Sequence, residues 1–123
     1  MILDQWRRSK FVWGQTDCIM ATANYIRDVT GQDPALPWRG TYDDEAGAVA
    51  ICSPYGGVLG LFRHGAALAR LQALDAPVSG SAVVCDVGGK EVAGVYLGQR
   101  AAFMSLRGCV EMRAKVLGAW SLP

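Results

Sequence analysis

Apolar residues recur at three- and four-residue steps in the segment after Cys18, a spacing typical of a helix buried along one side. These residues are Ile19, Ala23, Ile26 and Val29. Thr16 and Asp17 belong to the residue types that cap helix N-termini, and Gly31 is a typical stop. The pattern therefore predicts a helix that begins at Cys18 and ends before Gly31.

Three further helical segments are predicted in the first half of the chain. Residues 4–10 form a polar helix or lead-in, with Trp6 as the anchor onto the domain. Asp43 or Asp44 caps a short helix that Ser53-Pro54 ends. Gly56-Gly57 opens a segment over 58–64, and the Pro- and Gly-rich stretch 32–40 is an ordered loop.

The second half of the chain has a different pattern. Two apolar runs, 82–85 and 92–97, flank Gly88-Gly89, a β-hairpin signal. Further strands are predicted over 101–105, 109–113 and 116–120, whereas 66–74 suits either a helix or a strand. Helices followed by an antiparallel sheet define the α+β class, and we expect one domain over residues 1–123.

Composition narrows the range of functions. The chain has 123 residues, of which 51% are apolar and 19% charged, so a packed core is expected. Its net charge of +1, without a basic run, does not favour nucleic acid as a partner. No stretch approaches the roughly 18 apolar residues of a membrane-spanning helix, and no signal peptide is visible. We expect a protein made in the cytosol that does not insert into membranes.

The four cysteines are candidate chemical groups. Cys18, Cys52, Cys85 and Cys109 are spread along the chain without a C-x-x-C pair, and the chain has one histidine. This spacing argues against a zinc site or a c-type haem, so no metal or other cofactor is predicted. We expect all four to be free thiols.

Cys18 differs from the other three because it lies at a predicted helix start. Unpaired backbone N–H groups and the positive end of the helix dipole favour a thiolate there. Cys18 is therefore the candidate nucleophile.

Three segments together resemble a known family. They are W-G-x-x-D-C at 13–18, Gly80-Ser81-Ala82-Val83-Val84, and Gly94-Val95-Tyr96-Leu97-Gly98. The pattern is similar to the NlpC/P60 branch of papain-like cell-wall peptidases. Across nearly its whole length the chain resembles the small phage and prophage proteins related to that branch, which lie among tail genes. The resemblance implies a papain-like fold with helices packed on an antiparallel sheet.

The resemblance also assigns site positions. The position of the family's nucleophile is Cys18 here. The Gly-Asp pair that usually opens the family's first core strand is Gly80-Ser81 in this chain, so the acid is absent. The catalytic histidine, two residues before the strand glycine, falls on Val92. The third polar residue of the family's catalytic site falls within residues 103–105, where only Ser105 is polar.

A cysteine hydrolase needs a base to hold the thiolate and an acid to protonate the leaving amine. A helix end contributes about 0.3–1 kcal/mol to a nearby charge, and loss of general acid–base help typically costs about 10²–10⁴-fold in rate. We therefore expect a degenerate peptidase fold with a structural role. The resemblance implies a tail-tip or tail-assembly component of a tailed phage, prophage or gene-transfer particle. Its implied location is the virion tail, and its implied partners are hub, distal tail or tip proteins.

Two alternatives belong to other classes. An active thiol peptidase or amidase acting on peptidoglycan would need His64, or a histidine from a partner subunit, to face Cys18. A binding module would use the cleft of the family's active site to bind a peptide or glycan without cleaving it. Four tryptophans in so small a domain suit core and loop anchors better than sugar stacking; they are Trp6, Trp13, Trp38 and Trp120.

Overall fold

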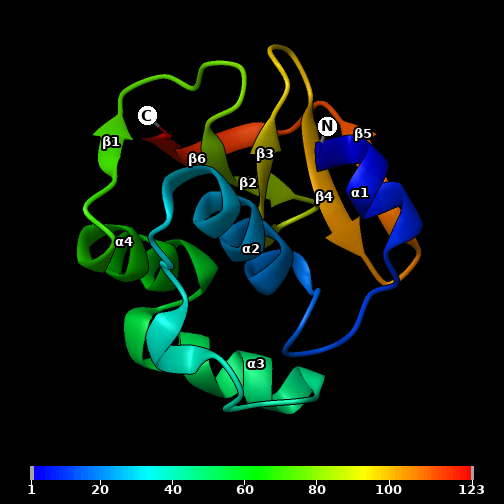
Figure 1. Ribbon diagram of the computed structural model, residues 1–123, viewed down its shortest axis with the longest axis vertical. Coiled ribbons are helices and arrows are strands. Elements are labelled where there is room, and N and C mark those ends of the chain that lie inside the picture. Colours follow the sequence, from blue (N-terminus) through cyan, green and yellow to red (C-terminus); the bar gives the residue numbers. More distant parts are fainter. Residues whose placement is uncertain (1, 123) are drawn as a thin grey trace.

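The computed structural model describes residues 2–122 as helices packed against a sheet (Figure 1). Within these residues there are four α-helices: α1 (Ile2–Arg8), α2 (Cys18–Thr30), α3 (Glu45–Cys52) and α4 (Val58–Leu68). Two short 3-10 helices lie between them, η1 (Leu36–Trp38) and η2 (Ser53–Tyr55).

A six-stranded antiparallel sheet is built from the second half of the chain. Its strands are β1 (Gln72–Leu74), β2 (Ala82–Val87), β3 (Lys90–Tyr96), β4 (Ala101–Ser105), β5 (Gly108–Met112) and β6 (Lys115–Ser121). The order across the sheet is β1-β6-β2-β3-β4-β5. The predicted α+β class, with N-terminal helices on a C-terminal antiparallel sheet, is confirmed.

Most predicted elements occur where the sequence indicates. The β2–β3 hairpin turns at Gly88-Gly89, and the ambiguous stretch 66–74 divides into the end of α4 and the short strand β1. The last strand, predicted over 116–120, lies inside the sheet between β1 and β2, so β1 pairs only with β6.

One face of the sheet is covered by helices. Residues of α2 and α4 pack with Ala82, Val84 and Ala93 of the sheet. Farther along the same face, α1 and α2 pack with Val95 and Met104. Figure 1 shows α2 crossing this face, in front of the strands. The predicted anchor Trp6 is buried in this layer, at 4% exposure.

Strand residues alone bury the centre of the opposite face. The buried residues of this cluster are Val83, Cys85, Ala101, Phe103 and Ala119, and every apolar residue packed against them also comes from a strand or from Ala114. Both faces of the central strands are therefore apolar.

Helix α2 follows its predicted pattern except at its end. Ile19, Ala23 and Ile26 are buried, but Val29 is 48% exposed. The inclusion of Val29 in the buried face was wrong. It lies in the last turn of α2, where apolar spacing alone does not ensure a packing partner.

Candidate functional site

Cys18 is the first residue of α2, and Asp17 caps the helix. The Oδ1 atom of Asp17 accepts a 2.9 Å hydrogen bond from the backbone N–H of Met20. At the other end Gly31 has a left-handed conformation and its N–H bonds to the carbonyl of Arg27. The predicted cap, start and stop of this helix are all confirmed.

Asp17 also binds the two loops beside the helix. Its Oδ2 atom accepts hydrogen bonds from the Gly14 N–H at 2.8 Å and from the Tyr42 hydroxyl at 2.6 Å. The side chain is 1% exposed, and these three donors satisfy the buried carboxylate. A Cβ atom on Gly14 would lie 2.1 Å from the Tyr42 carbonyl oxygen, so the loops approach each other closely.

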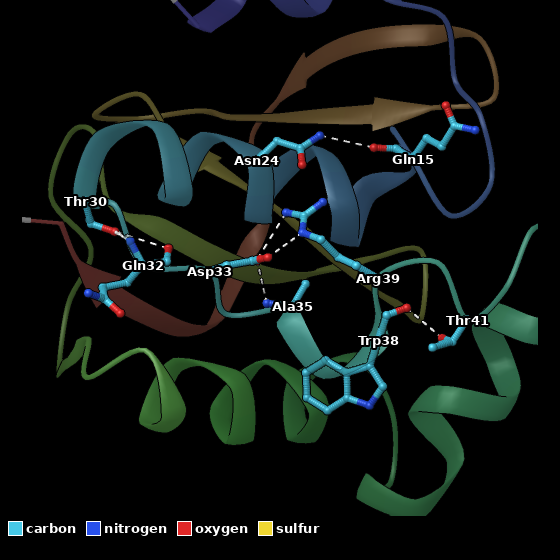
Figure 2. Close-up of polar contacts among 9 residues, drawn as sticks. All are labelled: Gln15, Asn24, Thr30, Gln32, Asp33, Ala35, Trp38, Arg39 and Thr41. Carbon is cyan, nitrogen blue, oxygen red and sulfur yellow. Dashed lines mark hydrogen bonds and ion pairs between the residues drawn. The ribbon is translucent and has the colours of Figure 1, made fainter.

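The loop that carries Tyr42 is held by its own hydrogen bonds (Figure 2). Asp33 accepts from the Ala35 N–H at 3.0 Å and forms an ion pair with Arg39. The Thr41 hydroxyl donates to the Trp38 carbonyl at 2.6 Å. These contacts fix the loop before it reaches Asp17, so Tyr42 meets the start of α2 in one defined position.

A cleft of about 630 Å³ opens beside Cys18. It lies between the start of α2, helix α3, the start of α4 and the beginning of β3. The side chains that define it are Trp13, Cys18, Val49, Cys52, Val58 and Glu91. Its polar side chains are two thiols, the Ser53 hydroxyl and four charged groups, and most of the rest is apolar.

Glu91 joins the two sides of this cleft. It lies on β3, and its Oε1 atom accepts a hydrogen bond from the backbone N–H of Leu59 at 3.3 Å. Helix α4 has Gly57 at its N-cap, which offers no side chain, so Glu91 supplies an acceptor from 32 residues away. A Cβ atom at Gly57 would lie 2.3 Å from Oε1, so only glycine admits the carboxylate here.

Burial dominates the chemistry of Cys18. Desolvation, with smaller contributions from the charges of Asp17 and Cys52, raises the pKa of the thiol to about 12 although backbone hydrogen bonds from Ala93 and Ile19 oppose the rise. The expectation that the helix start favours a thiolate was therefore wrong. The carboxylate that caps the helix adds a negative charge beside the sulfur, and burial outweighs the helix dipole.

The second thiol in the cleft has the same character. Burial, followed by the charges of Asp17 and Glu91, raises the pKa of Cys52 to about 11. Cys52 also raises the pKa of Cys18, and both thiols together with Asp17 raise the pKa of Tyr42, which places these groups in one cluster. All four cysteines of the chain are free thiols.

The structure does not bring Val92 to Cys18. Val92 packs in the strand-only cluster on the far face of the sheet, whereas its neighbour Ala93 lies on the helix face and its backbone contacts the Cys18 thiol. Successive strand residues point to opposite faces, so the position implied by the resemblance is one residue out of phase. Neither side chain carries a titratable proton.

The other sequence candidates also lie elsewhere. His64 is exposed on α4 and contacts Tyr55 and Trp38, with ring centroids 4.9 Å and 6.1 Å apart. Ser105 donates to the Gly108 carbonyl at 2.8 Å in the β4–β5 turn. None of the described residues that line the cleft is a histidine.

Among residues 2–122, no group of three or more His, Cys, Asp and Glu side chains is placed to hold a metal ion. In the same range, no single helix is long and apolar enough to span a membrane. The helical segments 45–55 and 58–68 together reach the length and apolar composition of such a helix, but they are bent by 72° at the break between them.

The site missed by sequence reasoning consists of Tyr42, Cys52 and Glu91. They come from a loop, from α3 and from β3; Tyr42 bonds to Asp17, whereas Cys52 and Glu91 line the cleft with Cys18. The Gly56-Gly57 pair was the one available signal, since a helix without a capping side chain requires an acceptor from elsewhere.

Fold and site together define an α+β domain with a desolvated thiol at a helix start, facing an open cleft. The chain belongs to the family described as Domain of unknown function (DUF6950), whose family model matches residues 1–122. No curated protein and no solved structure gives a significant match.

Proposed function

We propose that this protein is a catalytically inactive, papain-like domain of the NlpC/P60 type that serves as a structural component of a phage, prophage or gene-transfer particle tail. One observation supports the loss of catalysis most directly: the groups gathered around the Cys18 thiol are acidic. Asp17 and Cys52 raise the pKa of Cys18, and Asp17 and Glu91 raise that of Cys52.

Amide hydrolysis by a thiol needs a thiolate at the working pH and a proton for the leaving amine. With a pKa of about 12, the Cys18 thiol keeps its proton at neutral pH. The only imidazole in the chain, His64, is exposed on α4 and lies beside the Tyr55 ring, with a tilt of 35° between the ring planes. The cleft therefore lacks the imidazole that, in the NlpC/P60 family, would activate the thiol and protonate the leaving amine.

The place in a tail rests on the resemblance to small tail-gene proteins. Hub, distal tail or tip proteins are the partners we propose. Large apolar side chains left at the surface support a protein-binding role, among them Leu36 at 70% exposure and Val49 at 63%. Val49 also lines the cleft, so part of this apolar surface is continuous with it.

The loss of catalysis is tested by incubating purified protein with peptidoglycan and measuring soluble muropeptides. The expected result is no release above that of the Cys18→Ala variant. Release by the unmodified protein that disappears in Cys18→Ala would refute the proposal. The structural role is tested by mass spectrometry of purified particles and by labelling of their tails, where the protein should be found at fixed stoichiometry.

One observation favours a second candidate, an active thiol peptidase: Cys18 does line an open cleft. It would require a histidine from a partner subunit. Repeating the assay with intact particles, alongside His64→Ala, separates this candidate from a hydrolase that uses the chain's own imidazole.

A further inference from the structure

Glu91 has one carboxylate oxygen engaged and one unused. Oε1 accepts the hydrogen bond from the Leu59 N–H, but among the described residues no donor bonds to Oε2. The side chain is half-buried and lines the cleft. Oε2 is therefore a carboxylate acceptor that the described part of the chain leaves free in the wall of the cleft.

Most of the cleft that Glu91 lines is apolar. Trp13, Val49 and Val58 form the walls, and the thiols of Cys18 and Cys52 are protonated at neutral pH because burial raises the pKa of both. Asp17 is already saturated by three donors. Glu91 is therefore the acceptor that the cleft leaves open.

The balance of charge indicates the sign of the missing group. The charged residues that line the cleft are Asp17, Glu45, Lys90 and Glu91, so carboxylates outnumber the single ammonium. Both Lys90 and Glu45 are exposed at the rim, whereas Glu91 lies deeper. A cation that enters the cleft would meet an unpaired negative charge in surroundings that screen it less than bulk water does.

We propose that the cleft binds a lysine side chain from an extended segment of a partner protein, with the ammonium group on Oε2 of Glu91. The methylene stem of the lysine would pack between Trp13 and Val49, as the stems of such side chains do on apolar surfaces. This inference rests on the proposed function, a domain that binds neighbouring proteins, and names the surface and the chemistry of the segment.

The geometry selects lysine over arginine. A guanidinium binds a carboxylate best through two parallel N–H bonds that use both oxygens. Oε1 is already occupied by the N-terminus of α4, and Gly57 packs against it. A single free oxygen suits the compact ammonium, which makes a charge-assisted bond to one acceptor.

The experiment titrates ¹⁵N-labelled full chain with a capped pentapeptide, acetyl-Ala-Val-Lys-Val-Ala-amide, and follows the indole N–H signal of Trp13. Matched peptides carry norleucine or arginine in place of lysine. We expect the lysine peptide to bind about tenfold more tightly than the norleucine peptide, the usual effect of one charge-assisted hydrogen bond. Added salt should weaken only the cationic peptides.

The informative variant is Glu91→Gln, which keeps an acceptor for the Leu59 N–H but removes the charge. It should reduce lysine-peptide affinity about tenfold, to the level of the norleucine peptide, without changing the melting temperature. Glu111→Gln removes the same charge from β5, away from the cleft, and should leave affinity unchanged.

The proposal is overturned if norleucine binds as well as lysine, if arginine binds more tightly, if Glu91→Gln binds normally, or if no peptide shifts the Trp13 signal. These outcomes are distinct from a failure of the proposed function. Muropeptide release dependent on Cys18 would contradict the inactive-domain proposal whatever the peptides do, and absence of peptide binding would leave that proposal standing.

Discussion

The hydroxyl of Tyr42 donates a 2.6 Å hydrogen bond to Oδ2 of Asp17, the residue directly before Cys18. Burial and this bond raise the pKa of Tyr42, so the phenol keeps its proton and remains a donor. Asp17 thus starts the helix, joins two loops and places a negative charge beside the thiol. A residue that stabilises the fold here also suppresses the reactivity expected of a helix-start cysteine.

The first prediction concerns stability. Asp17→Ala removes a helix cap and leaves the Tyr42 hydroxyl and Gly14 N–H without their buried acceptor, so it should lower the free energy of unfolding by about 2–5 kcal/mol. Urea denaturation followed by circular dichroism measures this loss.

Asp44→Ala is the matched control for that change. Asp44 caps α3 through one exposed bond, from the Gly47 N–H at 2.7 Å, and should cost only about 0.5–2 kcal/mol. Equal losses in the two variants would mean that the bonds to Tyr42 and Gly14 contribute little.

A second prediction compares two glycines of similar conformation. Gly14 and Gly31 have φ values of 82° and 77°, but a Cβ atom would meet the Tyr42 carbonyl oxygen at Gly14 and nothing within 4 Å at Gly31. Gly31→Ala should cost about 1–2 kcal/mol from backbone strain alone, whereas Gly14→Ala should cost clearly more. Thermal unfolding of both variants tests this, and an equal shift in melting temperature would contradict the close approach of the two loops.

The third prediction is that Cys18 is a slow thiol. Its pKa of about 12 leaves little thiolate at neutral pH, so iodoacetamide should modify it more slowly than Cys109, where the charge of Arg7 partly offsets the rise in pKa that burial causes. Mass spectrometry of one partly alkylated sample gives both rates, and the unfolded chain in urea, where the two should react alike, is the control. Preferential labelling of Cys18 in the folded protein would indicate an activated nucleophile.

The fourth prediction is a loss of stability at high pH. The pKa values of Cys18 and Cys52 are about 12 and 11 in the folded chain, against about 8.5 for a free thiol. Above roughly pH 8.5 the unfolded chain therefore binds fewer protons than the folded one, so the free energy of unfolding should fall as pH rises from there toward 12.

Cys18→Ser tests the source of this fall. Its hydroxyl does not titrate in the range, so the decline between about pH 9 and 11 should be shallower than in the unmodified protein. Urea midpoints measured across this range provide the comparison. An identical pH profile in both proteins would show that Cys18 does not carry the effect.

Much of the fold could be predicted because its signals are local. Asp17, Gly31 and Asp44 act within a few residues of the helix ends they mark, and Gly88-Gly89 directs its own hairpin. The candidate site could be predicted only at Cys18 and Asp17. Tyr42, Cys52 and Glu91 reach the cleft through tertiary packing, which leaves no pattern in the neighbouring sequence.

Two errors have specific physical causes. The face of β3 on which Val92 lies could not be read from alternation, because Ala93, Gly94 and Val95 are buried whichever side they face. The ionisation of Cys18 was misjudged because the helix dipole is a local property, whereas desolvation depends on everything packed around the sulfur.

The place of β6 between β1 and β2 has a consequence for how the chain is made. Strand β2 has β3 as a hairpin partner early, but its other edge stays open until residues near 121 have left the ribosome. Strand β1 has no partner at all before then. We therefore expect the domain to stay partly folded during synthesis, because the edge of β2 has no partner until β6 pairs with it. Such an exposed edge favours either rapid pairing with β6 or binding by a chaperone.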